Sequence, residues 1–414
     1  MPITFKRHTL ANGLRVIVHE DHTTQLAACN VLYNVGSRDE NPLHTGIAHL
    51  FEHYMFCGSK HIPDYDTPLQ KIGAYNNAYT SQDHTHYYIV LPAQNLETAL
   101  WIESDRMLEL AFEQYSLDTQ KKVVIEEFKE TCLNRPFGDA WASFNKLIYS
   151  KYPYQWMPIG KKISHIETVT MEMMKGFFFR FYRPDNAILV IGGHVHFDEV
   201  IPLVEKWFSD IQPGNAANKH FPTEPTQRKA KFLELKNNVP YSILLKGWKM
   251  PQRLHPDFYT FDLLSDLLGT GKSSYLYQKF VTKEQLFTDI SLAVTGTAGP
   301  GTLALEARPA NGIDIHEANQ RLSDFLYNEF QFPNTLAHDL QKVKNRNESV
   351  ILNNEIKLDS RTSILAVEES ISKIEDFEND IATYQKVTED DVKRVFNQAV
   401  TYNRENTLFY SPLK

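Results

Sequence analysis

Two histidines and a glutamate, set close together in an otherwise apolar segment, constrain this chain more than any other feature. They are His49, Glu52 and His53, in the order His-Leu-Phe-Glu-His. We expect a helix over roughly residues 45–57, in which the two histidines lie one turn apart on one face and can bind the same metal ion. Glu52 falls on the same side, beside the position that the ion leaves open. Such a pattern also arises by chance, so a metal site needs a third ligand from elsewhere in the chain.

A later segment, predicted to be helical from about residue 116 to 134, offers three glutamates as the third ligand. At about 100° per residue, the inward face of this helix lies around Val124 and Phe128. Glu127 lies at the edge of that face, whereas Glu126 and Glu130 point away from it. An oxygen donor on a separate element suits a zinc-type site, and Glu127 is therefore the predicted third ligand.

These four residues together predict a reaction. An ion held by His49, His53 and Glu127 keeps one position for water, and it lowers the pKa of that water and polarises a carbonyl group. Glu52 would accept the proton from the water as general base and pass it to the leaving amine. The sequence therefore predicts a metal-dependent endopeptidase that forms no covalent intermediate.

The length of 414 residues exceeds one ordinary core and predicts two domains. Residues 213–228 are rich in proline and poor in apolar residues, so we expect a linker there, between domains at 1–212 and 229–414. The second half repeats the pattern of the first. Its predicted helix carries Asp262, Ser265 and Asp266 at the places of the three motif residues, and so lacks metal ligands. The predicted fold class is α+β, with two domains related by duplication.

Composition bears on the partners and the cellular compartment of the chain. A net charge of −8 argues against a nucleic-acid-binding surface. Three cysteines give no disulfide framework and suit a reducing compartment. The sequence has no apolar run long enough for a membrane span and no apolar leader at its start. We therefore expect a cytoplasmic protein, with a periplasmic one still possible if a leader has been removed.

Three further patterns resemble sites and are interpreted otherwise. The run Gly271-Lys272-Ser273 resembles the end of a phosphate-binding loop, but that loop needs a glycine where this chain has Asp266. His84 and His86 alternate along a predicted strand and are expected to be surface residues. His194 and His196 flank the end of another predicted strand and carry no further signal.

Several stretches of the chain resemble one peptidase family. The motif His-x-x-Glu-His has the order of the inverzincins, and Glu127 follows His53 by 74 residues. The chain thereby resembles the M16 (pitrilysin-type) metallopeptidases, above all their roughly 400-residue subunits, which include the processing-peptidase β subunit. Further matching stretches are Asn12–Leu14, Val35–Glu40, Gly73–Thr80 and Tyr182–Asn186.

The resemblance implies a fold, a cofactor and an assembly. The fold would be two homologous α/β-sandwich domains of the LuxS/mitochondrial-processing-peptidase-like metallohydrolase type. The cofactor would be one Zn²⁺ per chain. The assembly would be a dimer enclosing a chamber for unfolded peptides or presequences, with no nucleic acid involved.

The resemblance also assigns a substrate-binding strand. In the family, the stretch that matches Asn77, Ala78, Tyr79 and Thr80 is an edge strand to which the peptide adds as one more strand. Such pairing uses the main chain, so it can accept any extended peptide. Without the resemblance, the segment would be interpreted as an ordinary strand rich in Thr and Tyr.

Two departures from the family pattern leave an alternative open. Gln120 stands where family members usually carry a glutamate that hydrogen-bonds a ligand, which predicts weaker metal binding. Val281 and Thr288 stand where active members place an Arg and a Tyr that hold the substrate carbonyl. The partner is then a second copy of this chain, or an M16-like subunit that carries the Arg/Tyr pair. The alternative function is a catalytically weak or structural core-type subunit of such an assembly.

Overall fold

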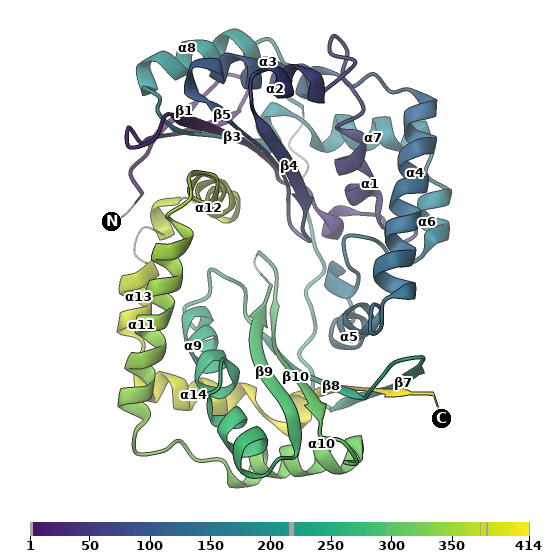
Figure 1. Ribbon diagram of the computed structural model, residues 1–414, viewed down its shortest axis with the longest axis vertical. Coiled ribbons are helices and arrows are strands. Elements are labelled where there is room, and N and C mark those ends of the chain that lie inside the picture. The colour runs from purple at the N-terminus through teal and green to yellow at the C-terminus, as the bar shows by residue number, and fades with distance from the viewer. Residues whose placement is uncertain (1–2, 215–218, 297, 373, 378–379, 414) are drawn as a thin grey trace. The chain divides into compact units, whose positions relative to one another are not determined.

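The computed structural model describes residues 3–214, 219–296, 298–372, 374–377 and 380–413. It is an α+β protein with two mixed sheets, one in each of two compact units (Figure 1), and the predicted fold class is confirmed. The first unit comprises Met1–Lys129, Trp156–Phe221 and Leu352–Glu378, and the second Glu130–Gln155, Pro222–Ile351 and Asn379–Lys414.

The sheet of the first unit has six strands in the order β1-β2-β6-β3-β5-β4. Only β2 and β6 pair in parallel, and β4 is an edge strand. The predicted hairpin at Asn12-Gly13 joins β1 to β2, with Gly13 in the left-handed region (φ 88°) that glycine adopts readily. The strands are β1 (Lys6–Thr9), β2 (Arg15–Glu20), β3 (Leu26–Tyr33), β4 (Tyr75–Thr80), β5 (Thr85–Pro92) and β6 (Ala187–Gly193).

Helices cover both faces of this sheet, which explains why its central strands are apolar throughout. Helices α3 and α12 lie on opposite faces of the sheet (Figure 1). In β3, Cys29 lies near charged groups of α3, whereas Asn30 is hydrogen-bonded to Thr362 of α12 and Leu32 packs in the same cluster as Leu365. The helices of this unit are α1 (Ile47–Tyr54), α2 (Asp66–Lys71), α3 (Leu96–Leu108), α4 (Gln114–Phe128), α6 (Ile163–Glu167), α7 (Met171–Phe181), α8 (Phe197–Phe208) and α12 (Leu358–Ile371).

The sheet of the second unit repeats the topology of the first. Its order is β7-β11-β8-β10-β9, and only β7 and β11 pair in parallel, as β2 and β6 do. The strands are β7 (Lys231–Asn237), β8 (Ile243–Met250), β9 (Phe287–Thr295), β10 (Gly301–Pro309) and β11 (Asn406–Pro412). The helices are α5 (Ala140–Ile148), α9 (Phe258–Gly269), α10 (Ile315–Asp324), α11 (Leu336–Asn354, within this unit up to Ile351), α13 (Asp380–Lys386) and α14 (Glu389–Ala399). Turns of π-helix lie at Lys129–Asn134, Tyr277–Lys283 and Phe325–Glu329.

The matching helix starts of the two halves have the same physical cause. The Thr170 hydroxyl accepts a 3.3 Å hydrogen bond from the backbone of Met173 and begins α7. The Thr388 hydroxyl accepts a 3.2 Å bond from the backbone of Asp391 and begins α14, as part of a capping box. Each helix leads to a strand of the parallel pair in its sheet. Helix α7 leads to β6, which pairs with β2, and α14 leads to β11, which pairs with β7. The repeat in the sequence is therefore a repeat of caps as well as of apolar spacing.

One helix from each half of the chain belongs to the unit built mainly from the other half. Leu365 and Ala366 of α12 pack with Leu32, Ile188 and Val190 in the core of the first unit. In the second unit, α5 packs over β8, β7 and β11. The units are therefore discontinuous in sequence, unlike the contiguous domains expected at 1–212 and 229–414. Each sheet needs an apolar cover on the face concerned, and nothing in the local sequence says which sheet an amphipathic helix will cover.

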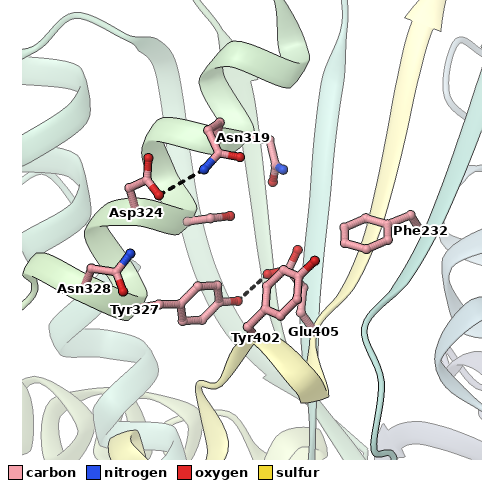
Figure 2. A pocket seen from close by; sticks show the side chains of 9 residues that line it. Phe232, Asn319, Asp324, Tyr327, Asn328, Tyr402 and Glu405 are labelled. Carbon is pink, nitrogen blue, oxygen red and sulfur yellow. Dashed lines mark hydrogen bonds between the residues drawn. The ribbon is translucent and has the colours of Figure 1, made fainter.

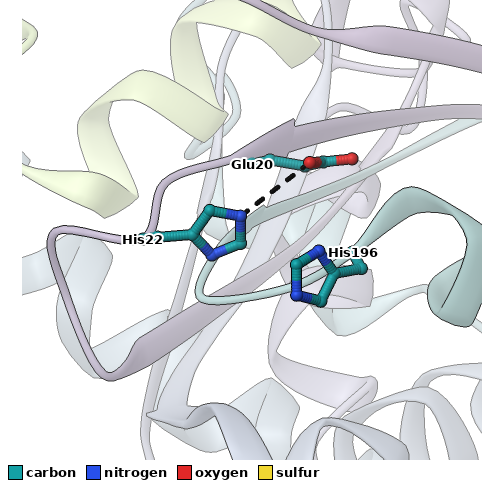
Figure 3. A group of neighbouring side chains, drawn as sticks. All are labelled: Glu20, His22 and His196. Atoms are coloured by element: carbon teal, nitrogen blue, oxygen red, sulfur yellow. Dashed lines mark ion pairs between the residues drawn. The ribbon is translucent and has the colours of Figure 1, made fainter.

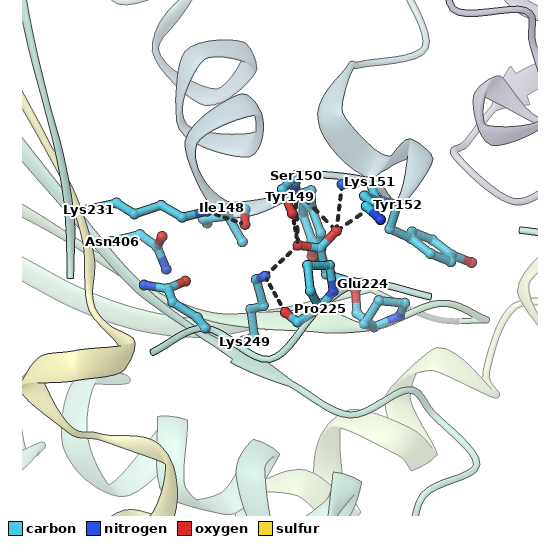
Figure 4. Close-up of polar contacts among 12 residues, drawn as sticks. Ile148, Tyr149, Ser150, Lys151, Tyr152, Glu224, Pro225, Lys231, Lys249 and Asn406 are labelled. Carbon is cyan, nitrogen blue, oxygen red and sulfur yellow. Dashed lines mark hydrogen bonds and ion pairs between the residues drawn. The ribbon is translucent and has the colours of Figure 1, made fainter. Parts of the chain in front are cut away.

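The described part of the expected linker is held in place by one carboxylate. Residues 215–218 of that segment lie outside the described residues. Glu224 accepts hydrogen bonds of 2.9–3.1 Å from the backbone N–H groups of Ser150, Lys151 and Tyr152, and an ion pair from Lys249 (Figure 4). Burial alone would raise the pKa of Glu224, but these donors outweigh it and lower the pKa to about 2.

A buried ion pair lies beneath a pocket in the second unit. Lys246 Nζ lies 2.7 Å from Glu405 Oε1, and the hydroxyl of Tyr327 donates to the same carboxylate (Figure 2). Burial lowers the pKa of Lys246 to about 8, against the opposing effect of Glu405. The pocket above has a volume of about 290 Å³. Its other lining residues include Phe232, Asn319, Asp324, Asn328 and Tyr402.

The described residues contain no helix that could span a membrane. Not one of the helices bounded above combines the length and the apolar character that crossing a bilayer demands.

Candidate metal centre

Two helices of the first unit bring the three predicted ligands together. His49 and His53 extend from α1, and Glu127 extends from the last turn of α4. The imidazole rings lie 4.8 Å apart, centroid to centroid, and nearly perpendicular. His49 Nε2 and His53 Nε2 lie 3.7 and 3.5 Å from Glu127 Oε2. One ligand atom from each residue thus falls within 4.8 Å of the others.

These separations suit ligands of one ion better than hydrogen-bond partners. A hydrogen bond between nitrogen and oxygen spans about 2.7–3.2 Å, which is shorter than either distance to Glu127. Donors arranged tetrahedrally around zinc lie about 3.4 Å apart, because each metal–ligand bond is about 2.0–2.2 Å. The residues therefore fit a zinc ion, and two neutral imidazoles with one carboxylate form a donor set that zinc prefers.

Burial keeps His49 available as a ligand. Its burial, and then the charge of His53, lower the pKa of His49 to about 4. At neutral pH the imidazole is therefore uncharged, with a lone pair free to bind a cation.

A buried carboxylate, not anticipated from the sequence, holds the start of the motif helix. Glu40 Oε1 accepts hydrogen bonds from the backbone of Gly46 (3.0 Å) and Ala48 (2.9 Å), at the first turn of α1. Its other oxygen accepts a 2.9 Å bond from the indole of Trp156. Gly46 has φ 91°, which suits glycine. A carboxylate at a helix start satisfies N–H groups that the helix leaves free, and here it positions the helix that carries both histidines.

Glu52 is buried beside the three ligands. Its Oε2 accepts a 2.6 Å hydrogen bond from the hydroxyl of Thr80. Burial raises the pKa of Glu52 to about 7; the Thr80 hydroxyl opposes this rise, and the nearby charge of Glu127 adds to it. A carboxylate with a pKa near neutrality can both take up and release a proton at that pH.

The predicted substrate strand is the free edge of the first sheet. In the sheet as described, β4 pairs along one side with β5 and has no strand on its other side. Side chains alternate along it: Asn77 and Tyr79 are exposed, while Ala78 and Thr80 are half-buried. Thr80 ends the strand at Glu52. An unpaired strand edge can accept an extended peptide through main-chain hydrogen bonds.

The expectation that His84 and His86 are surface residues is wrong. Both are buried, and burial lowers their pKa values to about 4 and about 3. His86 Nδ1 lies 3.1 Å from the hydroxyl of Tyr79. His86 lies in β5 and His84 just before that strand, and both side chains are covered by the rest of the unit.

Gln120 takes a different partner from the one expected. Its amide donates to the thiol of Cys57, 3.3 Å away, at the turn that follows α1. It therefore braces the end of the motif helix through Cys57. A side-chain amide brings no charge to this position, and weaker metal binding stays a prediction.

In the second unit, the residues at the motif positions are paired within the protein. Asp266 forms a 2.8 Å ion pair with Arg346, and the hydroxyl of Tyr384 donates to Asp262. Ser265 donates to a backbone carbonyl. The two groups of potential ligands found among the described residues both lie in the first unit. The aligned Val281 lies in a π-helical turn and Thr288 in β9.

Known proteins are similar to this chain in sequence and in fold. Sequence models match the chain as "Insulinase (Peptidase family M16)" over residues 15–135 and as "Peptidase M16 inactive domain" over residues 168–345. Zinc protease PqqE of Helicobacter pylori is 34% identical over 286 residues, which cover 67% of this chain and 64% of that protein. Mitochondrial-processing peptidase subunit beta of Caenorhabditis elegans is 28% identical over 63% of this chain and 56% of that subunit.

Solved structures agree with the sequence matches. The crystal structure of a protease from Helicobacter pylori has a TM-score of 0.90 and 26% identity, covering 100% of both chains. The curated relatives named above are matched over less than two thirds of their own length. Fold and site together define a duplicated α+β protein with one His-x-x-Glu-His site. The chain belongs to the M16 peptidase family.

Proposed function

We propose that this chain is a zinc-dependent endopeptidase that hydrolyses unfolded peptides or presequences, with one Zn²⁺ per chain bound by His49, His53 and Glu127. The observation that carries the proposal is the separation of 3.5 and 3.7 Å between the imidazole nitrogens and Glu127 Oε2. These distances match ligands of a shared ion. The description of relatives as zinc proteases supports the same choice of metal.

Glu52 is the proposed general base. A bound zinc ion supplies Lewis-acid chemistry, which activates water and polarises a carbonyl group. The Glu52 carboxylate accepts the proton of the attacking water and delivers it to the nitrogen of the leaving amine. Thr80 holds the carboxylate by its 2.6 Å hydrogen bond, so one oxygen stays oriented while the other exchanges the proton. The pKa of about 7 suits both halves of this transfer.

The edge of β4 is the proposed substrate platform. A peptide that adds to Asn77, Ala78, Tyr79 and Thr80 pairs through its main chain, so recognition tolerates many sequences. Because only an extended segment can pair in this way, folded proteins are poor substrates. The strand ends at Thr80, which places a paired peptide next to Glu52.

A second candidate function follows from Val281 and Thr288. Neither side chain can replace the Arg/Tyr pair expected to hold the substrate carbonyl, because valine has no polar group and threonine has no cation. The chain would then be a weakly active or structural subunit that forms a homodimer, or a heterodimer with an M16-like chain that carries the pair.

Metal analysis combined with one substitution tests the proposal. The purified chain should contain at least one zinc ion, and Glu52→Gln should keep the zinc while losing roughly 10²–10⁴-fold in kcat on an unstructured peptide. Glu126→Gln, on the exposed side of α4, serves as a control and should keep the rate. A metal-free wild-type protein, or full activity in Glu52→Gln, would contradict the peptidase function. Zinc binding with turnover only after a second subunit is added would favour the second candidate.

A further inference from the structure

A second group of potential metal ligands lies in the first unit, away from the motif helix. It consists of Glu20, His22 and His196 (Figure 3). One ligand atom from each residue lies within 4.8 Å of the other two. His22 Nε2 is 3.9 Å from Glu20 Oε2, too far for a hydrogen bond. The spacing therefore resembles that of the three ligands already described.

Parallel pairing of β2 with β6 brings these residues together across more than 170 positions of the chain. Both strands end at the same edge, where Glu20 lies opposite Gly193. His22 stands in the turn that follows β2, and His196 is the residue from which α8 begins. The backbone N–H of Asp21 donates to the carbonyl of Gly193 (2.8 Å) and ties the two loops to each other.

Local hydrogen bonds make both loops rigid. The Asp21 carboxylate accepts from the backbone and the hydroxyl of Thr23, at 2.9 and 2.6 Å, which fixes the turn carrying His22. Gly193 has φ 115°, and a Cβ there would come within 2.1 Å of the carbonyl oxygen of Leu26. The backbone positions of the ligands are thus set before any ion binds, which lowers the entropic cost of binding.

The two oxygens of Glu20 have different partners. Oε1 accepts 3.0 Å hydrogen bonds from Lys6 Nζ and from the backbone N–H of Phe197. Oε2 faces His22 (Figure 3). One oxygen therefore orients the carboxylate, and the other points into the group, as outer-shell hydrogen bonds orient metal ligands elsewhere.

Two further imidazoles lie close to that of His22. The ring of His22 lies 4.7 Å from that of His196 and 5.2 Å from that of His194, centroid to centroid. His22 and His196 are exposed, so their rings can rotate by the small amount needed to close donor separations of up to 4.8 Å to about 3.4 Å. Imidazole and carboxylate donors together select transition-metal ions over calcium or magnesium.

We infer that Glu20, His22 and His196 form a second metal site, which binds a divalent transition-metal ion such as Zn²⁺ or Ni²⁺, with His194 within reach as a fourth ligand. The site is independent of the proposed peptidase function, because it shares no residue with the first centre. The bound ion would join the turn after β2 to the start of α8. It would stabilise the folded first unit by binding only when these loops are formed.

Metal stoichiometry in untagged full-length protein tests the inference. Zinc bound after equilibrium dialysis should be about two equivalents in the wild type. It should fall to about one in the double variant His22→Ala/His196→Ala and to about one in His49→Ala/His53→Ala. The variant with all four substitutions should bind none. His8→Ala is the matched control, since His8 faces a single carboxylate, Glu205, 3.5 Å away, and should keep two equivalents.

A second readout does not depend on counting ions. Added Ni²⁺ should raise the Tm of His49→Ala/His53→Ala, and the rise should disappear when His22→Ala and His196→Ala are also present. If the first-centre variant fails to fold, the loss of one equivalent from His22→Ala/His196→Ala in the otherwise wild-type chain still decides the matter. Unchanged stoichiometry in that variant would overturn the second site and would leave the proposed peptidase function untouched.

Discussion

Thr80 Oγ1 lies 2.6 Å from Glu52 Oε2 and donates a hydrogen bond to it. This bond joins the end of the free edge strand β4 to the carboxylate proposed as general base. Because the two groups are in contact, a peptide that pairs along β4 would directly affect the position of the Glu52 carboxylate. The proposed substrate strand and the proposed general base are thus joined by one hydrogen bond.

Removal of the Thr80 hydroxyl is expected to impair turnover more than metal binding. Thr80→Val should lower kcat/KM by roughly 10–100-fold, since a hydrogen bond to a charged group contributes about 1.5–3 kcal/mol. Because this bond opposes the rise in the pKa of Glu52, its loss should raise that pKa. The base acts only when ionised, so the acidic limb of the pH–rate profile should move to higher pH than in the wild type.

Thr80→Ser is the matched control, since it keeps the hydroxyl and should behave like the wild type. A Thr80→Val variant with a lower rate but an unmoved acidic limb would show that Thr80 acts on the strand and not on Glu52.

Glu127 and Glu126 offer a matched pair for the metal. Glu127→Ala should weaken zinc binding by more than the roughly 10–100-fold typical of residues that only support a ligand, because it removes one of three donors. Glu126 pairs with Lys129 on the exposed side of the same helix, so Glu126→Ala should leave the affinity unchanged. Competition with a chromophoric chelator measures both. Equal affinities in the two variants would remove Glu127 from the ligand set.

The buried carboxylate of Glu40 should support both stability and metal binding. Glu40→Gln places an amide group against at least one of three N–H donors, which should cost about 1–3 kcal/mol in the free energy of unfolding. The start of α1 should then shift, and zinc affinity should fall as well. Urea unfolding and zinc titration measure the two effects. Leu43→Ala, at an exposed side chain in the same loop, is the control that should change neither.

Glu224 gives a prediction about pH. Its folded-state pKa of about 2 lies below the ordinary value of about 4.3, so its stabilising effect is present above pH 4.3 and is lost as pH falls toward 2. At pH 7, Glu224→Gln should lower the free energy of unfolding by about 2 kcal/mol, measured by urea unfolding. The difference from the wild type should narrow between pH 4 and pH 3. Glu167→Gln, at an exposed position, is the control and should show no such difference. If the difference in free energy of unfolding between the wild type and Glu224→Gln stays constant with pH, the ion pair of Glu224 does not stabilise the fold.

Much of the fold follows from patterns that are local in the sequence. The patterns of the two halves predicted an α+β fold with two similar parts, and the structure confirms that fold class. The spacing of His49 and His53 placed both on one face of a helix, and the direction of Glu127 on α4 placed it at the inward edge. These inferences worked because helix and strand periods are set by backbone geometry within a few residues.

Other features depended on contacts that no local pattern encodes. The sequence pattern predicted that His84 and His86 are exposed, but the packing of other elements buries both. The pairing of β2 with β6 determines that His22 and His196 meet. Glu40 is an unremarkable residue in the sequence, and its role exists only because the start of α1 folds against it.

The sequence by itself determined the motif, the duplication and the family of this protein, and it singled out Glu127 as the candidate third ligand, since each is a matter of residue type at fixed spacing. The tertiary structure alone decided that α5 and α12 belong to the units opposite to their place in the chain. It alone also decided that Thr80 contacts Glu52 and that a second group of ligands forms at the end of β2. The physical reason is that burial and long-range pairing depend on the total packing of each sheet, to which residues hundreds of positions apart contribute together.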